Sequence, residues 1–361
     1  RPVSAPRVVM VTGAAGFIGA NTVAWLLRNR PEVFVVSYDA FTYAAHPDSL
    51  AMVTAGFEQR HALVRGDVRD AAQLHAVLSG RAHDATGAAI PSPDTIWHLA
   101  AETHVDRSIL DPTTFVDANV GGTLRVLEEV RAAAQRGQHL RLVHVSTDEV
   151  YGSLAPTDAP FVEGRALDPS SPYAASKAAA DLLVAGWAKT FGLDAVITRC
   201  SNNYGPFQFP EKLIPLMITR ALAGERLPVY GDGRQVRDWL HVDDHASALW
   251  AVTTSAASEG RVFHIGASGE RENLDVVHRV LDTLGADRGL VEHVRDRPAH
   301  DRRYAMDASR LRAETEWSPR VSFDEGLAAT IAWYRERETW WRALQREAHR
   351  ASDALYATDA R

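Results

Sequence analysis

Cysteine is nearly absent from this chain, since Cys200 is the only one in 361 residues. A single cysteine excludes an internal disulfide framework and favours a reducing compartment, so we expect a cytoplasmic protein. Apolar runs long enough to span a bilayer are also missing, and the first residues lack the apolar segment of a secretory signal. We therefore expect no membrane partner.

The chain also has no excess of positive charge, and its formal net charge is −7. General electrostatic attraction to nucleic acid is therefore not expected, and an anionic ligand would need local Arg and Lys side chains. The histidines show no metal-ligand spacing with Cys or carboxylates, so we expect no metal. With 46% hydrophobic and 24% charged residues, the composition is that of a globular protein of about two domains.

Short apolar runs alternate with helical patterns in the first 200 residues. The expected strands are residues 8–11, 33–37, 62–64, 95–99, 142–146 and 195–198, and the main expected helices are 17–27, 70–78, 113–134 and 171–190. This alternation predicts an α/β fold with a parallel sheet covered by helices on both faces. After residue 200 the pattern is irregular, which suits a smaller mixed α/β lobe.

A glycine-rich turn, Gly13-Ala14-Ala15-Gly16-Phe17-Ile18-Gly19, joins the first strand to the first helix. Glycines permit a tight turn and close approach of the backbone, and the helix N-terminus favours a pyrophosphate. The fold predicted by this turn is a Rossmann-type doubly wound parallel sheet. Asp39 lies twenty positions after Gly19 and ends the second run. A carboxylate there accepts hydrogen bonds from a ribose diol and repels a 2′-phosphate, which favours NAD+ over NADP+.

Further strand ends add weaker signals for the same cofactor. Asp67 follows the third run and is expected to face the adenine, although Asp is also common in turns. Ala100 and Ala101 follow the fourth run, where small side chains leave room for a cofactor or for close helix packing. All these positions lie at carboxyl ends of strands, where open parallel sheets bind ligands.

The chemistry is indicated by Thr147-Asp148-Glu149, which follows the expected strand 142–146, and by Tyr173 and Lys177 one helical turn apart. We expect the Lys177 ammonium to lower the pKa of the phenol, so that Tyr173 takes an alcohol proton during hydride transfer. Two adjacent acids provide proton transfers that simple redox chemistry does not need. Both reach one substrate only if the chain turns after Thr147; the alternative is a turn with solvated acids.

Longer shared segments carry a family resemblance. They are residues 100–108 (AAETHVDRS), 147–152 (TDEVYG), 201–206 (SNNYGP), 209–215 (FPEKLIP), 236–240 (VRDWL), 296–298 (DRP) and 300–303 (HDRR). In these segments the chain resembles the extended short-chain dehydrogenase/reductases, and among them the dTDP-glucose 4,6-dehydratases. The glycine turn and the Tyr/Lys pair are typical of the superfamily, whereas the Thr-Asp-Glu, PEKLIP and RDW segments are more specific.

The resemblance implies a reaction and a role for each catalytic residue. Tyr173, assisted by Lys177, would take the C4 hydroxyl proton of dTDP-glucose while hydride passes to NAD+. Glu149 would remove the C5 proton, Asp148 would protonate the departing C6 hydroxyl, and Thr147 would bond near the C4 oxygen. Hydride returns to C6, so the product is dTDP-4-keto-6-deoxy-D-glucose plus water. Asp148 must be protonated near neutrality, which burial or the charge of Glu149 would provide.

The resemblance also implies two sets of binding residues. The cofactor set is Gly13, Gly16, Phe17, Ile18, Gly19, Asp39, Thr42, Asp67, Val68, Leu99, Ala100, Ala101, Tyr173, Lys177 and Asn202. The substrate set is Thr103, Asp148, Glu149, Asn203, Lys212, Leu213, Pro228, Tyr230, Arg237, Asn273, Arg297 and His300.

Within the substrate set, Arg237 and Arg297 suit a diphosphate and Tyr230 would stack on the pyrimidine. The alternatives are an ion pair of Arg237 with Asp243 or Asp244, and core packing of Tyr230. One departure lies at residues 40–46, AFTYAAH, where the family often has KLTYAGN. The ribose contacts of that segment are therefore in question.

The sequence leaves three alternatives open. A nucleotide-sugar 4-epimerase shares the cofactor site and Tyr/Lys pair but does not need Asp148 and Glu149 as acid and base. A 4,6-dehydratase for another nucleotide sugar differs mainly in the nucleobase pocket. A non-catalytic NAD-binding regulator has no evident use for all five catalytic residues.

The expected domain organisation follows from the same pattern. Residues 1–200 form the NAD-binding domain, to which 238–262 return; residues 201–237 and 263–338 form the nucleotide-sugar lobe; and 339–361 form a terminal helix or tail. The resemblance implies a homodimer formed through the helices at 113–134 and 171–190, whose many small residues permit close packing.

Overall fold

The main sheet of this protein is parallel throughout and has seven strands in the order β10-β6-β5-β4-β1-β2-β3. It comes from a computed structural model that describes residues 5–84, 86–256, 261–296 and 300–345. The strands are β1 (Val8–Thr12), β2 (Phe34–Asp39), β3 (His61–Arg65), β4 (Thr95–His98), β5 (Arg141–Thr147), β6 (Ala195–Cys200) and β10 (Val262–Ile265). The order reverses direction at β1 and β4, as in a doubly wound fold, which confirms the expected fold class.

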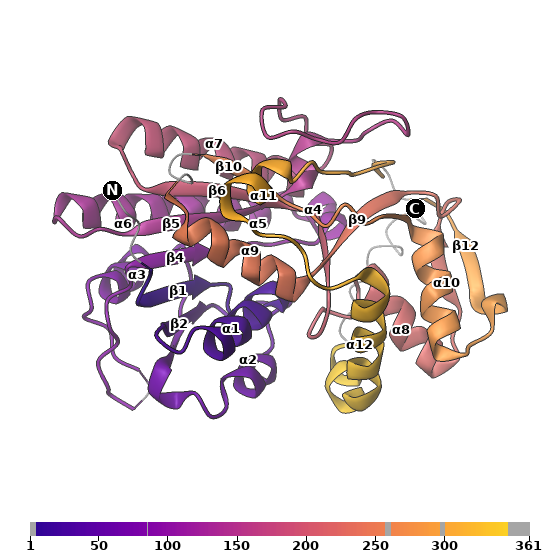
Figure 1. The fold of residues 1–361 in the computed structure, drawn as a ribbon. Coiled ribbons are helices and arrows are strands. Elements are labelled where there is room, and N and C mark those ends of the chain that lie inside the picture. The colour runs from indigo at the N-terminus through magenta and orange to yellow at the C-terminus, as the bar shows by residue number, and fades with distance from the viewer. Residues whose placement is uncertain (1–4, 85, 257–260, 297–299, 346–361) are drawn as a thin grey trace.

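Helices cover both faces of this sheet (Figure 1). One layer contains α1 (Phe17–Asn29), α2 (Pro47–Thr54), α9 (Val242–Thr254) and α11 (Ser309–Thr315); the other contains α3 (Ala71–Leu78), α6 (Gly122–Gln135) and α7 (Pro172–Phe191). Alternate residues of β1 enter the two cores, since Val9 and Val11 pack with the first layer and Met10 with the second. Burial on both faces explains why the strands are apolar runs.

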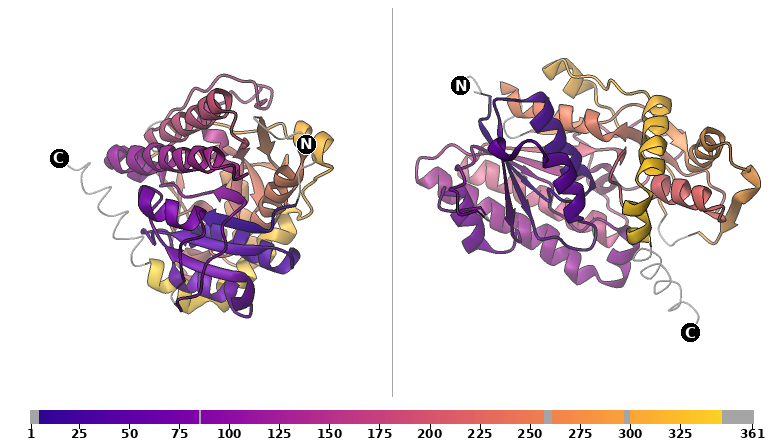
Figure 2. Two further views of the ribbon diagram at one scale, coloured as in Figure 1. Left: turned by 90° about the vertical axis from the view of Figure 1, so that its left-hand side faces the viewer. Right: turned by 90° about the horizontal axis from the view of Figure 1, so that it is seen from below.

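The smaller lobe is built from short strands and three helices. One sheet has the order β11-β9-β7, from Glu270–Glu272, Val236–His241 and Asn202–Tyr204, and β8 (Leu227–Tyr230) pairs in parallel with β12 (Val291–Val294). Helices α8 (Leu213–Ala223), α10 (Asn273–Leu284) and α12 (Phe323–Glu336) enclose a separate apolar core. Figure 2 shows this lobe beside the main sheet, with α12 near the junction of the two parts.

The chain crosses between the two parts more than once. Strand β9 stays in the small sheet, whereas α9 packs on α1 and β10 pairs with β6 of the main sheet. Residues 339–345 of the expected terminal tail are helical, and residues 346–361 lie outside the described residues. The domain limits inferred from the sequence stay a prediction.

The expected helix at 113–134 is not continuous. It is divided into α5 (Pro112–Phe115), a π-helical turn η2 (Val116–Gly121) and α6. The π turn places Asn119 inward, where its amide nitrogen donates to Glu102 O at 3.0 Å and to Ser176 Oγ at 2.8 Å. These bonds tie α7 to the loop after β4, and such turns are frequent at functional sites.

Candidate active site

A cavity of about 410 Å³ runs along the carboxyl edge of the main sheet. All the residues of the expected cofactor set line it, as do the five expected catalytic residues Thr147, Asp148, Glu149, Tyr173 and Lys177. The carboxyl ends of parallel strands meet at one edge, which is why residues from β1 to β6 converge there. The structure shows that these residues line one cavity, and their individual roles in binding remain predictions.

The N-terminus of α1 forms one end of the cavity. Gly16 is its N-cap, and within the described residues the helix has no side-chain cap and no acid in its first turn. The backbone N–H groups of that turn are thus available to an anion such as a pyrophosphate. Close packing holds the turn in place, because a Cβ on Gly19 would lie 2.0 Å from Gly13 O.

Asp39 stands at the next strand end and is nearly fully buried. Its Oδ2 accepts from Ala15 N at 2.8 Å and its Oδ1 accepts from Phe41 N at 2.7 Å. Burial raises the pKa of Asp39, and the two backbone bonds oppose that rise. The carboxylate therefore orients both the glycine turn and the 40–46 segment around the place where a ribose would lie.

Asp67 has a partner that the sequence reasoning missed. Arg69 donates to both of its carboxylate oxygens, at 3.0 Å from Nε to Oδ1 and 2.6 Å from Nη2 to Oδ2. These bonds hold the pKa of Asp67 below its ordinary value. Both residues line the cavity, so the guanidinium reaches it as well as the carboxylate. A bidentate Arg–Asp pair two residues apart carries no periodic signal that would have revealed it.

At the end of β5 the chain turns into a short 3₁₀ helix, Asp148–Tyr151. Thr147 caps it by accepting from Glu149 N at 3.3 Å, and its hydroxyl donates to Asp148 Oδ1 at 3.2 Å. Adjacent side chains point to opposite faces in a strand, so they can face one ligand only where the chain turns in this way. It brings both acids to the cavity, and the alternative of a turn with solvated acids is excluded for Asp148, which is only 2% exposed.

The surroundings of Asp148 favour the protonated form of its carboxyl group. Its Oδ2 is buried and has no hydrogen-bond partner among the described residues. Burial, followed by the charge of Glu149, raises the pKa of Asp148 well above its ordinary value, while Arg237 opposes the rise. A carboxyl group that is neutral near pH 7 can donate a proton, as a general acid must.

Tyr173 and Lys177 face the cavity from the first turns of α7. The helix begins at Pro172, and the N-cap Ser171 accepts from Ala174 N at 3.1 Å. Lys177 Nζ donates to Val145 O at 2.8 Å. Burial and then the charge of Glu149 raise the pKa of Tyr173 well above its ordinary value. The expectation that the Lys177 ammonium lowers the pKa of the phenol stays a prediction, because burial and the nearby carboxyl groups set the net direction in the protein alone.

The expected substrate residues divide into two groups. Thr103, Asn203 and Lys212 line the cavity with Asp148 and Glu149. The cavity lining does not include Leu213, Pro228, Tyr230, Arg237, Asn273 or His300. Arg297 lies outside the described residues. The substrate roles of all these residues stay predictions.

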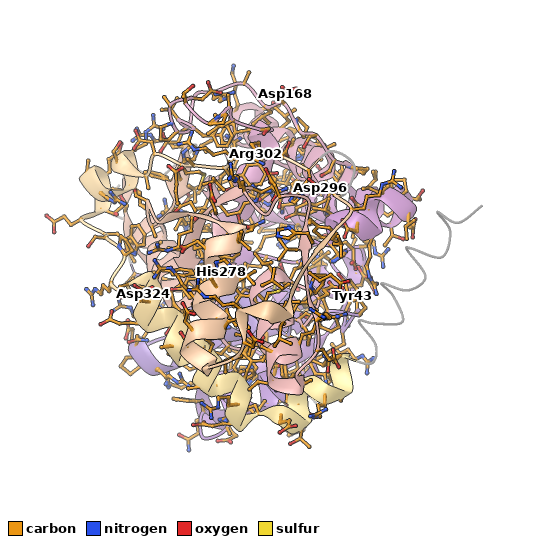
Figure 3. All side chains as sticks on the ribbon, turned by 90° about the vertical axis from the view of Figure 1, so that its right-hand side faces the viewer. Tyr43, Asp168, His278, Asp296, Arg302 and Asp324 are labelled. Atoms are coloured by element: carbon orange, nitrogen blue, oxygen red, sulfur yellow. The ribbon has the colours of Figure 1, made fainter. Side chains whose placement is uncertain are left out.

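The residues away from the cavity are held by contacts of their own. The rings of Tyr230 and His300 meet edge-to-face at 6.0 Å, and His300 Nδ1 lies 2.6 Å from Asp296 Oδ1; Asp296 is labelled in Figure 3. Arg237 donates to Asp301 O at 2.9 Å and lies 4.2 Å from the ring centre of Tyr304. Arg237 is buried, and a buried charged group needs such partners.

Several cavity residues were missed by the sequence reasoning. They include Arg69, Glu102, Cys200, Ser201, Gln208, Phe209 and Glu211. Cys200 pairs in register with Thr147 on the neighbouring strand, so alignment of strand ends would have found it. Burial raises the pKa of the Cys200 thiol to about 12.

The unusual 40–46 segment contacts the opposite wall of the cavity. Tyr43 donates to Glu211 Oε1 at 3.1 Å, and the Arg107 guanidinium lies 3.6 Å from the centre of its ring. Thr42, Ala44 and Ala45 line the cavity itself. The segment therefore keeps a place at the site although its Lys, Gly and Asn are replaced.

The described residues contain neither a metal-binding cluster nor a membrane-spanning helix. No cluster of three or more His, Cys, Asp or Glu side chains in the described ranges is arranged to hold a metal ion. Within the same ranges, no helix has the length and apolar character that crossing a membrane requires.

Comparison with known proteins identifies the family. The family described as GDP-mannose 4,6 dehydratase matches residues 10–330. A dTDP-glucose 4,6-dehydratase of Streptomyces griseus is 47% identical, covering 93% of this chain and 96% of that protein. Another, from Neisseria meningitidis serogroup B, is 44% identical, with coverage of 95% and 98%. The chain belongs to the dTDP-glucose 4,6-dehydratase family.

Solved structures support this membership and confirm the resemblance found in the sequence. A dTDP-glucose 4,6-dehydratase from Streptomyces venezuelae, solved with NAD bound, has a TM-score of 0.84 at 44% identity, covering 93% of this chain and 99% of that one. A UDP-glucose 4-epimerase from Thermus thermophilus, also in complex with NAD, has a TM-score of 0.79 at 28% identity, with coverage of 91% and 99%. The fold is shared with epimerases, but the sequence is much nearer the dTDP-glucose 4,6-dehydratases.

The raised pKa of Asp148 predicts how an Asp148→Asn variant depends on pH. In the unfolded chain Asp titrates near 3.8, whereas the folded-state pKa is higher, so the native protein loses stability as pH rises between these values. The variant escapes this loss. Its melting temperature should be near that of the wild type at about pH 4 and exceed it by about 2 °C or more at neutrality.

Thermal unfolding from pH 4 to 9 measures this difference. Asp282→Asn is the matched control, because Asp282 is exposed and Arg288 lowers its pKa. For that variant the difference should be small and should favour the wild type. A melting temperature of Asp148→Asn below the wild type across the whole range would contradict a neutral Asp148.

Proposed function

We propose that this protein converts dTDP-D-glucose to dTDP-4-keto-6-deoxy-D-glucose and water, using tightly bound NAD+. One observation carries the proposal: Asp148 and Glu149 face the same cavity as Tyr173 and Lys177. A dehydrogenase needs only the Tyr/Lys pair, whereas elimination of water needs an acid and a base beside it. Membership of the dTDP-glucose 4,6-dehydratase family supports the same reaction.

NAD+ fits the cofactor end of the cavity through the first turn of α1, Asp39 and the small residues Ala100 and Ala101. When bound, it accepts hydride from C4 and later returns it to C6. The protein's own residues hold it next to the acids. Asn202 supports this, because its buried Oδ1 lines the cavity and has no partner among the described residues.

The side chains would then move three protons. Tyr173 takes the C4 hydroxyl proton, with the Lys177 ammonium offsetting the developing charge. The resulting ketone acidifies C5, whose proton passes to Glu149. Asp148 gives its proton to the C6 hydroxyl, which leaves as water, and Glu149 returns its proton to C5 after hydride reaches C6. Tyr173 then releases its proton to solvent and Asp148 takes one up, which resets both groups. The C5–C6 double bond forms as the C6–O bond breaks, and no net oxidation occurs.

The other readings fit the site less well. A 4-epimerase returns hydride to C4 and has no step that needs a protonated Asp148. A non-catalytic binder has no use for a buried acid whose Oδ2 has no hydrogen-bond partner within the described ranges. A 4,6-dehydratase for another nucleotide sugar shares all the catalytic groups, so only substrate tests distinguish it.

We also propose a homodimer in which α6 and α7 of one copy pack on those of another. The two helices lie side by side (Figure 2, left). Their outer surface carries apolar side chains, including Val116 at the start of η2 and Leu182 on α7, which is 65% exposed. Burial of such side chains between copies would stabilise association. A cytoplasmic location is proposed on the single cysteine of the chain.

Mass spectrometry of the product formed from dTDP-glucose tests the proposed reaction. The product should be lighter by one water with the nucleotide retained, and Glu149→Gln should lower the rate by about 10²–10⁴-fold by removing the base. An unchanged mass, with a galactose epimer found by chromatography, would instead establish epimerisation. Turnover only with UDP- or GDP-sugars would move the specificity to another nucleobase.

The dimer proposal predicts that Leu182→Glu forms monomers. A charge introduced in the centre of an apolar contact loses its hydration on association and opposes it. Light scattering after size-exclusion chromatography measures the mass, and Met52→Glu on α2 is the control, because Met52 is exposed and apolar but lies in the opposite helix layer. A monomeric wild type, or a dimeric Leu182→Glu variant, would contradict this arrangement.

A further inference from the structure

A row of buried polar side chains crosses the main sheet on the face covered by α6 and α7. Its members come from five strands and are Thr12, His98, His144, Arg199 and His264. Register places Thr12 beside His98, His98 beside His144, and Arg199 beside His264. The row lies under the catalytic end of the cavity, in a layer where the neighbouring residues toward the amino ends of the strands are apolar.

Hydrogen bonds connect most of this row. His98 Nδ1 lies 2.8 Å from Thr12 Oγ1, and its Nε2 lies 3.1 Å from Thr123 Oγ1. At the other end, Arg199 donates to the Tyr151 hydroxyl, which lies 2.7 Å from His264 Nε2. The rings of His98 and His144 are 5.5 Å apart.

Asp181, on α7, lies beside Arg199 and His144 of this row. It is 1% exposed, and its Oδ2 accepts from Arg199 Nε at 2.8 Å. Its Oδ1 lies 3.3 Å from His144 Nε2, outside hydrogen-bond geometry. Although burial alone would raise the pKa of Asp181, His144 and Arg199 hold it below the ordinary value, so the carboxyl group is ionised.

Asp181 follows Lys177 by four positions, so the two side chains lie on the same face of α7, one turn apart. The groups that face Lys177 or its immediate neighbours are Tyr173 and Asp181 on α7, His98 on β4, His144 on β5, and Arg199 and Cys200 on β6. Burial raises the pKa of Tyr173 and Cys200 and lowers that of both histidines, which disfavours charge on all four in the protein alone. The acids Glu149 and Asp148 face Tyr173 from the cavity, whereas Asp181 is the carboxylate on the same face of α7 as Lys177.

Structure alone does not require this carboxylate. Replacing a buried ion pair by well-packed apolar residues is often neutral or stabilising, because ionised groups lose hydration on burial. Here two buried cations, Lys177 and Arg199, lie around one anion. A catalytic ammonium that must stay charged in a dry core gives this costly arrangement a function.

We propose that Asp181, one turn from Lys177 on the same buried face of α7, is a positioning residue that keeps the Lys177 ammonium charged while Val145 O orients it, and that Arg199 modulates this by pairing with the same carboxylate. The proposal rests on the proposed function only in assigning Lys177 to the assistance of Tyr173. Asp181 acts through Lys177 and does not line the cavity.

The composition makes a direct test possible, because Lys177, Lys189 and Lys212 are the only lysines in the chain. The protein with NAD+ present would be labelled with ¹³C at lysine Cε, and the three signals followed by NMR from pH 6 to 11; Lys177→Met assigns the buried one. In Asp181→Asn the titration midpoint of Lys177 should fall by about one pH unit or more, a tenfold loss of proton affinity. Asp181→Glu should restore most of it.

Arg199→Gln provides a test of opposite sign. Gln still donates to Asp181 and Tyr151 but carries no charge, so the field of the carboxylate at Lys177 increases and the midpoint should rise. This variant decides the question if Asp181→Asn does not fold. An unchanged Lys177 midpoint in Asp181→Asn, or a lowered one in Arg199→Gln, would overturn the proposal; Lys189 and Lys212 serve as internal controls.

Turnover of dTDP-glucose provides a second readout. The alkaline limb of kcat/KM should move with the Lys177 midpoint, to lower pH in Asp181→Asn and to higher pH in Arg199→Gln. A loss of rate with an unmoved limb would mean a structural role for Asp181 and would also overturn the proposal. If the wild type does not turn over dTDP-glucose, the proposed function fails, yet the NMR titration still decides the role of Asp181.

Discussion

The loss of hydration at ionisable groups is the constraint on which this active site depends. The main sheet is covered on both faces, so ligand-binding groups gather where the parallel strands end. The turn after Thr147 places Asp148 at that edge but leaves it almost without solvent. An ionised carboxylate is costly in such a place, and this cost raises the pKa of Asp148 well above its ordinary value. Burial is thus the main reason that the protonated form of Asp148 is favoured.

The same burial has opposite consequences for neighbouring groups. It raises the pKa of the Tyr173 phenol, which the Lys177 ammonium must offset for proton uptake, and it opposes the charge that Lys177 must carry. A buried cation beside neutral histidines needs an anion, and the geometry offers Asp181 one turn farther along α7. Strand β6 connects this ion pair to the cavity. Arg199, whose guanidinium binds Asp181, directly precedes Cys200, which lines the cavity. The packing around Tyr173, Lys177 and Asp181 therefore influences their protonation as well as their positions.

Much of the fold and the cavity could be predicted because short-range patterns encode them. The apolar runs and the glycine turn predicted the parallel sheet, and the strand ends predicted where Asp39 and Thr147 would lie. Long-range pairings had no such pattern: Tyr43 with Glu211, and the row from Thr12 to His264, depend on how distant segments meet in the fold. The net pKa of Tyr173 could not be predicted either, because it depends on how much water the folded protein excludes.

The central claim is that C4 oxidation, loss of water and reduction at C6 occur in one site on one bound substrate. Dehydration of dTDP-glucose carrying deuterium at C4, mixed with unlabelled substrate, tests it most directly. The account predicts that the product carries deuterium at C6 and that no label crosses into molecules that began unlabelled. Deuterium that remains at C4 or appears in solvent would contradict the account.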